Sequence, residues 1–406
     1  MKILGIKPYY IFSICASLCV QIIALILVYI LTPEDYGYYS LITSVAQIMF
    51  ILCSGWTNAT VINIGTREYR DTGTYKDLII YRLIIVSSCF VLISIIFYLS
   101  KSYITDFVGN EEKYNLTYLF FLGLIFNDFV CQIFYPGEKN TFQTMTMLFF
   151  NSGILLCVII FVKSLTEYIY INAIIQSLLF IFLMSAFFIY YRESKFSFSL
   201  SKFKTILTYS GWQLFGVLGL YLINLGSNYI LRGNNIEVEE IGLYNFAYKL
   251  FCCFVPVFSL LGVVLPKWIH DKNINNKWIF IKTRMCVVIT ILVVCYILVW
   301  FLLPIFLRII NKVDYLHSTD YFIFLLPAFV FFSINQILNI ILLNTQYYKY
   351  SQIISIAQGI VLIIASSAMV NLWGVYGAII GNIMSFLIGT ILYTYVFKNQ
   401  INNLVQ

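Results

Sequence analysis

Long uncharged runs of apolar residues recur along the whole 406-residue chain. The runs are apolar on all sides and lack the alternation of apolar and polar positions that a strand of a membrane barrel shows. A helix needs roughly 20 apolar residues to cross the hydrocarbon core of a bilayer. The pattern therefore predicts membrane-spanning helices, of which the first six cover residues 10–31, 38–63, 78–100, 115–134, 141–162 and 168–191.

The second half of the chain repeats this arrangement. One uncharged run, Tyr350 to Phe397, holds 48 residues and would form a helix of about 72 Å, so it must fold back on itself. The glycines and the asparagine of NLWGVYG, residues 371–377, permit a turn there. The sequence thus predicts an all-α polytopic membrane protein with about 12 transmembrane helices, the last six covering residues 207–231, 243–267, 285–307, 321–345, 352–371 and 375–397.

Short local matches link the two halves of the chain. PEDYGYYS at residues 33–40 and EEIGLYN at residues 239–245 both place acids before a glycine and a tyrosine, at equivalent positions between two predicted helices. Two apolar matches, GILL with GIVL and AII with AII, occur at nearly the same offset of about half the chain. Six spans per half give both halves the same orientation, so we predict two six-helix lobes, residues 1–200 and 201–406, with a central cleft.

The composition supports a membrane protein and the charge distribution orients it. Hydrophobic residues make up 61% of the chain and charged residues only 11%, which excludes an ordinary soluble domain. Of the 25 Lys and Arg residues, 18 fall on the side of the N-terminus and six on the other side, while Lys249 lies within a span. Cytoplasmic loops are rich in cations, so both termini are predicted to be cytoplasmic, with both acidic turns in external hairpins. The net charge of +7 then reflects orientation and implies no nucleic-acid partner.

Nothing in the sequence indicates a metal or an organic cofactor. The ten cysteines fall within or at the edges of apolar spans and form no C-x-x-C pair, and the chain has only two histidines. No G-x-x-x-x-G-K-[ST] motif for binding ATP occurs. A coupling ion, H⁺ or Na⁺, is left open. The loops are short and leave no extramembrane domain, so the duplicated bundle favours transport.

Three stretches together resemble a known family. LTPEDYGYYSLITSVAQIMF, IEVEEIGLYNFAYKL and MVNLWGVYGAIIGNIMSFLIGTILYTYVF resemble the polysaccharide or O-antigen flippases of the multidrug/oligosaccharidyl-lipid/polysaccharide exporter superfamily, over nearly the whole chain. The chain departs from the family at SNYIL, residues 227–231, which lacks the charged pair expected before the second external hairpin.

The resemblance implies a substrate, a location and partners. It implies a multi-pass protein of the bacterial inner membrane that is not an enzyme and that moves an undecaprenyl-pyrophosphate-linked oligosaccharide, an O-antigen or capsule repeat unit, by alternating access between two lobes. The implied partners are this lipid-linked oligosaccharide, membrane lipids and other membrane proteins of polysaccharide assembly.

Polar residues within the spans are the candidates to line the cleft, because a charged substrate needs partners in hydrocarbon. Lys249 contacts the substrate or extends to the outer interface, and Arg82 meets an entering phosphate or extends to the inner interface. Asp128 is protonated, paired with a cation or used by a coupling ion, or else is a structural acid within the bundle. Six amide side chains line the sugar pathway or link helices: Asn127, Gln213, Asn224, Asn335, Gln336 and Asn339.

Two other functions compete with the flippase. A cation-coupled multidrug exporter of the same superfamily shares the architecture, and Asp128 is its best feature. A positive cleft would favour the glycan lipid and a negative cleft the drug. An intramembrane O-antigen polymerase or ligase would carry a sizeable periplasmic loop with a catalytic arginine, and the predicted loops are too short for that.

Overall fold

The computed structural model describes residues 8–194, 196, 198–258, 261, 265, 277–343 and 348–397, and within them it is helical, with no β-strand. The chain divides into two compact units, which are described separately below. The division falls inside two long helices, after Val217 and around Thr32–Ser40. The lobe limits at residues 200 and 201 stay a prediction from the sequence repeat.

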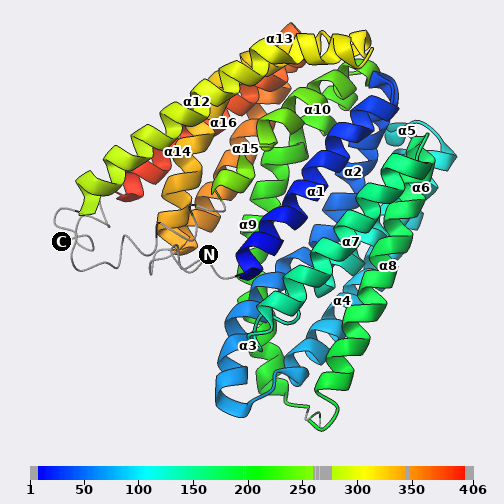
Figure 1. Cartoon of the computed structure of the whole chain (residues 1–406), viewed down its shortest axis with the longest axis vertical. Helices are drawn as coiled ribbons and strands as arrows, with labels where there is room; N and C mark the ends of the chain where they lie inside the picture. Colours follow the sequence, from blue (N-terminus) through cyan, green and yellow to red (C-terminus); the bar gives the residue numbers. More distant parts are fainter. Residues whose placement is uncertain are drawn as a thin grey trace. The chain divides into compact units, whose positions relative to one another are not determined.

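The first unit comprises Met1–Leu31 and Leu41–Val217. Helix α1 packs against α7, and α6 packs against α8, whereas α3 and α5 lie at opposite ends of the unit (Figure 1). The helices of this unit are α1 (Pro8–Ile30), most of α2 (Pro33–Cys53), the 3-10 helix η2 (Gly55–Thr57), α3 (Asn58–Thr72), α4 (Lys76–Leu99), α5 (Lys101–Val108), α6 (Glu111–Val130), α7 (Asn140–Phe161), α8 (Leu165–Tyr190) and the first part of α9 (Leu200–Gly233).

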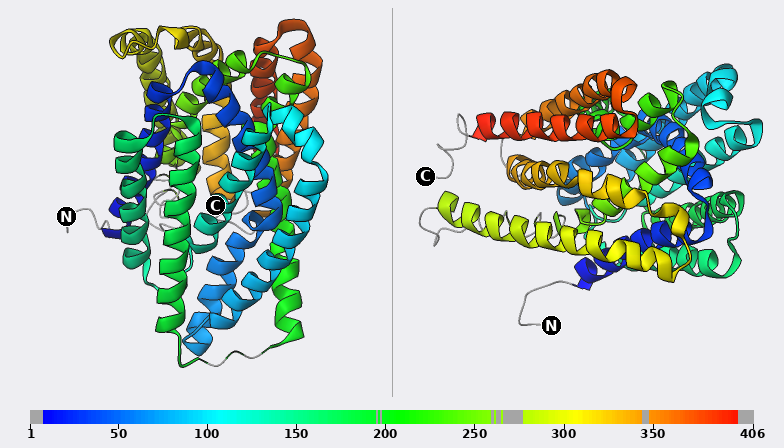
Figure 2. Two further views of the ribbon diagram at one scale, coloured as in Figure 1. Left: turned by 90° about the vertical axis from the view of Figure 1, so that its right-hand side faces the viewer. Right: turned by 90° about the horizontal axis from the view of Figure 1, so that it is seen from above.

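The second unit comprises Thr32–Ser40 and Leu218–Gln406. Besides the start of α2 and the remainder of α9, it contains α10 (Val238–Cys252), α12 (Lys277–Ile309), η3 (Val313–Tyr315), α13 (Ser318–Phe324), α14 (Leu326–Leu343), α15 (Tyr348–Trp373) and α16 (Val375–Val396). Helices α15 and α16 form a hairpin (Figure 2). The hairpin turns at Gly374, whose φ of 54° suits glycine, and this confirms the turn predicted in NLWGVYG.

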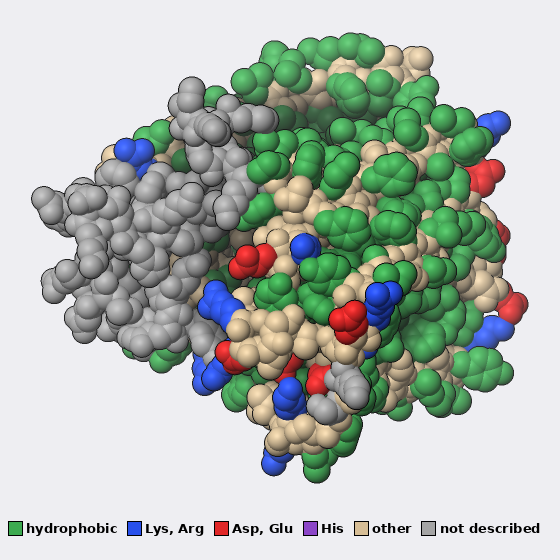
Figure 3. All heavy atoms as spheres, turned by 60° about the horizontal axis from the view of Figure 1, so that its bottom comes forward, with side chains coloured by type: hydrophobic (Ala, Val, Ile, Leu, Met, Phe, Trp, Pro, Cys, Tyr) green, Lys and Arg blue, Asp and Glu red, His purple; other side chains and the backbone are tan. Residues whose placement is uncertain are grey.

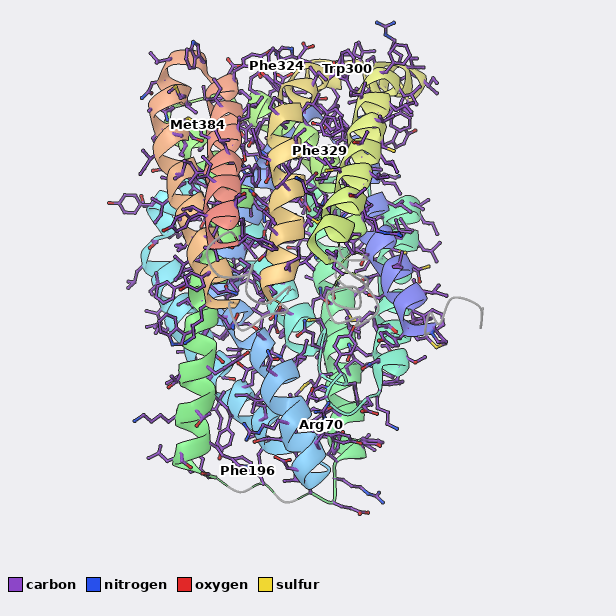
Figure 4. All side chains as sticks on the ribbon, turned by 90° about the vertical axis from the view of Figure 1, so that its left-hand side faces the viewer. Arg70, Phe196, Trp300, Phe324, Phe329 and Met384 are labelled. Carbon is purple, nitrogen blue, oxygen red and sulfur yellow. The ribbon has the colours of Figure 1, made fainter. Side chains whose placement is uncertain are left out.

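Aromatic packing holds the second unit together around Phe329 of α14, which is labelled in Figure 4. The ring centroid of Phe329 lies 4.7 Å from that of Tyr296 on α12 and 5.6 Å from that of Phe251 on α10. Tyr296 in turn stacks on Phe322 of α13, with centroids 4.0 Å apart. Large buried rings at these separations combine apolar burial with favourable ring geometry, so one cluster ties four helices.

Eleven of the described helices are long and apolar enough to cross a membrane, which confirms a multi-pass membrane protein. On the face drawn in Figure 3, hydrophobic side chains cover much of the described surface, and charged side chains gather in one area and along an edge. Helix α6, predicted as a span at 115–134, is not among the eleven. The end of the predicted span 243–267 and both termini lie outside the described residues.

Two predicted continuous spans are interrupted in the structure. The span predicted at 38–63 ends at Cys53, passes through η2 and continues as α3 to Thr72. The span predicted at 321–345 is divided at Leu325 into α13 and α14. Pro327, which has no N–H to donate, stands in the first turn of α14, where a helix tolerates it. The break at Leu325 has apolar residues on both sides, so average hydropathy does not register it, whereas the break after Cys53 is followed by the polar helix α3.

The repeated acidic turns have a different role from the one predicted. The helices begin at Pro33 and Val238, so Gly37 and Gly242 lie inside α2 and α10 and not in the hairpins that precede them. A Cβ on Gly37 would collide with the carbonyl oxygen of Val238, and a Cβ on Gly242 with that of Pro33. The two glycines therefore allow the backbones of α2 and α10 to touch at their first turns, as small residues do between membrane helices.

Substitution of Gly37 by alanine should destabilise this contact by about 1–3 kcal/mol, because the backbone of α10 cannot give way as a flexible side chain would. The matched control is Gly153→Ala in α7, where a Cβ meets nothing within 4 Å. Thermal unfolding of the detergent-solubilised protein should show a lower transition for Gly37→Ala and an unchanged or higher one for Gly153→Ala. Equal transitions for the two variants would contradict the close approach.

Candidate functional site

The first unit contains a buried ion pair between two of the candidate residues. Arg82 of α4 is only 1% exposed, and its Nη2 lies 3.3 Å from Oδ2 of Asp128 on α6. Its Nε donates to Oγ1 of Thr57 at 2.8 Å, and its Nη1 donates to the carbonyl oxygen of Phe129 at 2.8 Å. The guanidinium carbon also stands 4.6 Å from the centroid of the Phe129 ring, so Arg82 is held on several sides.

Asp128 is satisfied as fully as its partner. Ser54 Oγ donates to Asp128 Oδ2 at 2.7 Å, and the side-chain amide of Asn58 donates to Asp128 Oδ1. The side-chain oxygen of Asn58 accepts from Arg82 Nη2, so Asn58 bridges the cation and the anion. A buried ion pair is tolerated when further hydrogen bonds satisfy both members, which is the case here. Of the roles considered for Asp128 from the sequence, the structure shows the ion pair with a cation, Arg82.

These side chains meet where helices end. The last carbonyls of a helix lack partners within it, and in hydrocarbon no water replaces them. Arg82 takes the Phe129 carbonyl, Gln143 Nε2 donates to the Val130 carbonyl at 2.9 Å, and the Tyr75 hydroxyl donates to the Ile133 carbonyl at 2.7 Å. These hydrogen bonds satisfy carbonyl groups at the end of α6. Ser54, Thr57 and Asn58, which lie at the break between α2 and α3, bond to the Arg82–Asp128 pair and so connect this break to α4 and α6.

The arrangement has little freedom to bind a ligand while it is intact. The Nε, Nη1 and Nη2 nitrogens of Arg82 each already donate to a protein oxygen, and both carboxylate oxygens of Asp128 accept hydrogen bonds. A phosphate at Arg82, or a cation at Asp128, would have to break the pair and leave the other charge buried. Sequence reasoning missed Ser54, Thr57 and Asn58, although SGWTNAT at residues 54–60 is a polar stretch within an apolar run.

Lys249 differs from the buried pair. It lies on α10 of the second unit, is half-buried, and has neither a hydrogen-bond nor an ion-pair partner within the described part of the chain. An ammonium group at membrane depth is costly unless a partner or water reaches it. Among the charged candidates, Lys249 is thus the one without a protein partner in the described part of the chain.

Several candidate amides link helices of the second unit. Asn335 of α14 donates to the Phe386 carbonyl of α16 at 2.9 Å and accepts from Thr390 at 2.8 Å. Asn339 accepts from Ser351 of α15. Asn224 of α9 accepts from the Tyr248 hydroxyl of α10 at 3.2 Å. These three side chains act as interhelical hydrogen-bonding groups, which was the alternative role stated from the sequence.

The other three candidate amides form no hydrogen bond between helices within the described residues. Gln213 on α9 and Gln336 on α14 are half-buried, and neither has a hydrogen-bond partner among the described residues. Asn127 precedes Asp128 on α6, and its Oδ1 is buried without a partner in the described part of the protein. Whether any of these amides lines a substrate pathway stays a prediction.

Comparison with protein-family models identifies the family. The model described as "Polysaccharide biosynthesis protein" matches residues 26–266, more than half of the chain. The chain belongs to this polysaccharide biosynthesis family. Among curated proteins, no sequence matches the chain significantly.

Solved structures of transporters share the fold of this family member. The lipid II flippase MurJ in an inward closed conformation is similar with a TM-score of 0.73 and 15% identity, over 98% of this chain and 89% of MurJ. An inward-facing multidrug resistance transporter of the MATE family, within the MOP superfamily, gives 0.64 and 16% identity, over 99% and 96% of the two chains. The bent form of VcmN, a MATE transporter of Vibrio cholerae, gives 0.62 and 11% identity, over 98% of each chain. These likenesses confirm the predicted fold class, an all-α bundle of membrane helices like that of MurJ and the MATE transporters.

Replacement of Arg82 by methionine should leave Asp128 charged and unpaired in the bundle, and breaking a buried pair in this way costs about 3–5 kcal/mol. We expect low yield and a lowered thermal unfolding transition for Arg82→Met, and recovery of most of the loss in Arg82→Met with Asp128→Leu. A transition for Arg82→Met equal to that of the wild type would contradict the structural role of the pair.

Proposed function

We propose that this protein is a flippase that moves a lipid-linked oligosaccharide across the bacterial inner membrane by alternating access between its two lobes. The observation that carries the proposal is membership of the polysaccharide biosynthesis family together with the MurJ-like fold. A protein of polysaccharide synthesis built almost entirely of membrane helices needs a substrate that lies in the membrane, and a lipid-linked glycan satisfies this requirement.

The proposed carrier is undecaprenyl pyrophosphate, and the proposed cargo is an O-antigen or capsule repeat unit. A pyrophosphate must not enter hydrocarbon without partners, since unpaired charges there are very costly. Lys249 supplies a cation without a protein partner among the described residues, so it is the proposed pyrophosphate contact. Membrane lipids and other polysaccharide-assembly proteins are proposed as further partners, and H⁺ or Na⁺ as a coupling ion.

The orientation proposed has both termini in the cytoplasm. The end of α3, with Arg70, and the segment with Phe196 lie at the same end of the first unit (Figure 4). Both segments fall between predicted spans, in stretches that the cation count assigns to the cytoplasmic side, so the arrangement supports that assignment.

A multidrug exporter is the second candidate, since MATE transporters share the fold. Such an exporter would need an available acid for its cationic drug or coupling ion. Asp128 is occupied by Arg82 and two further hydrogen-bond donors, so this acid gives the exporter little support. A polymerase or ligase has weaker support still, because the similar structures described above are a flippase and transporters.

Deletion of the coding sequence should cause lipid-linked glycan units to accumulate in the inner leaflet, and the wild-type gene should restore surface glycan. Lys249→Gln should lower the restored export about tenfold, the expected loss of one charge-assisted contact, whereas Lys249→Arg should retain most of it. The matched control is Lys204→Gln, an exposed cation at the start of α9, which should export normally.

Protein levels and thermal unfolding transitions of the three variants must match those of the wild type. Normal surface glycan in a deletion strain without a redundant flippase would reject the proposed function. Normal export by Lys249→Gln would reject only the proposed pyrophosphate contact.

A further inference from the structure

An aromatic groove opens between α4, α6 and α8 of the first unit, where α4 ends and α6 begins. Its volume is about 480 Å³, which lies in the range of small-molecule sites. We define the aromatic groove by its floor, Phe97, Tyr114 and Tyr118, and its rim, Tyr98, Asn115 and Tyr170. No candidate residue from the sequence lies in it.

The floor of the groove is made of packed aromatic rings. Phe97 and Tyr114 stack with ring centroids 4.4 Å apart and an interplanar angle of 14°, and Tyr118 lies 5.4 Å from Phe97. The hydroxyl groups of the floor are already engaged: Tyr114 donates to the Phe97 carbonyl, and the Tyr118 hydroxyl lies 3.0 Å from Ser94 Oγ. The floor therefore offers a fixed apolar surface.

The rim is polar and unoccupied by protein partners. Tyr98 is 74% exposed and Tyr170 is 51% exposed, and Asn115 is exposed beside them. Within the described residues, none of these three side chains has a hydrogen-bond partner. Two phenol groups and one amide thus surround an aromatic floor with free donors and acceptors.

We propose that the aromatic groove binds a neutral sugar ring of the lipid-linked oligosaccharide, an inference that rests on the function proposed above. A pyranose ring has faces of C–H groups and a rim of hydroxyl groups. The aromatic rings of the floor pack against a face of the sugar, and the phenol groups and the amide of the rim form hydrogen bonds with the sugar hydroxyls. In the proposed orientation α4 ends and α6 begins at the outer side, so the groove holds a sugar on the side to which the substrate is delivered.

Two other occupants fit the groove less well. An acyl chain would cover the Tyr98, Asn115 and Tyr170 polar groups without satisfying them, which costs free energy. An anionic headgroup would need a cation, but the described lining holds no charged side chain, and the nearby Lys101 is paired with Glu111. The neutral, hydroxyl-rich ligand is the one that matches both the floor and the rim.

The test uses the purified full-length protein in deuterated detergent micelles and saturation-transfer NMR with four probes, the methyl glycosides of glucose, galactose, N-acetylglucosamine and rhamnose. We expect saturable transfer to at least one of them, weakened about fivefold or more by Tyr98→Leu and by Tyr170→Leu, since each removes a ring and a hydroxyl. Tyr98→Phe keeps the ring and should weaken binding less. The control is Tyr103→Leu on α5, whose side chain is 82% exposed and outside the groove.

Three outcomes would overturn the proposal: no saturable transfer to any of the four sugars, transfer unchanged in both leucine variants, or displacement of every bound sugar by phosphatidylglycerol, which would identify a lipid site. Both leucine substitutions fall on exposed side chains, and unfolding transitions equal to that of the wild type confirm their integrity. Absence of sugar binding to the groove would not change the result expected from the deletion strain. Normal surface glycan in the deletion strain would reject the proposed flippase function, whatever the groove binds.

Discussion

Within the hydrocarbon core of a bilayer, every backbone polar group must find its partner inside the protein, and this constraint explains most of the structure. Unbroken helices satisfy it by themselves. Where a helix ends or breaks, side chains must do so, and several buried polar side chains lie at such places. Arg82, Gln143 and Tyr75 bond the last carbonyls of α6 and of the turn that follows. In the second unit, the Tyr296 hydroxyl donates to the Phe322 carbonyl beside the break at Leu325.

Close packing of the helices depends on a second consequence of the apolar solvent. Between membrane helices lipid competes equally with apolar side chains, so close backbone contact and hydrogen bonds matter more than burial alone. Gly219 of α9 meets the backbone of Ser355 on α15, and Gly377 of α16 meets that of Met369. Gly389 leaves room for the Gln358 and Asn335 side chains. The glycines and the amides are thus parts of the same packing arrangement.

The sequence predicted the helices and the family well, because both depend on patterns that are local or spread over the whole chain. Hydropathy found the spans, and the turn at Gly374 followed from the length of one run. The break at Leu325 was missed because a window of apolar residues averages over it, and the break at Ser54 was missed although the polar helix α3 follows it. The sequence could not predict which residues interact with one another. Arg82 and Asp128 are 46 positions apart, and nothing at either position indicates the other as its partner. The residues of the aromatic groove come from three helices, and nothing in a composition with 74 aromatic residues distinguishes the five aromatic residues of the groove.

The chemistry of the charged candidates bears on what such a bundle can carry. Arg82 and Asp128 neutralise each other and are held by uncharged donors and acceptors, so together they present no net charge to a substrate. Lys249 is then the charged candidate without a partner among the described residues, and it is a cation. A residual positive charge attracts a phosphate and repels a cationic drug, by an amount that grows as the local dielectric falls. In the proposed function, Lys249 and the aromatic groove serve two different parts of a glycan lipid: Lys249 the charged pyrophosphate and the groove an uncharged sugar.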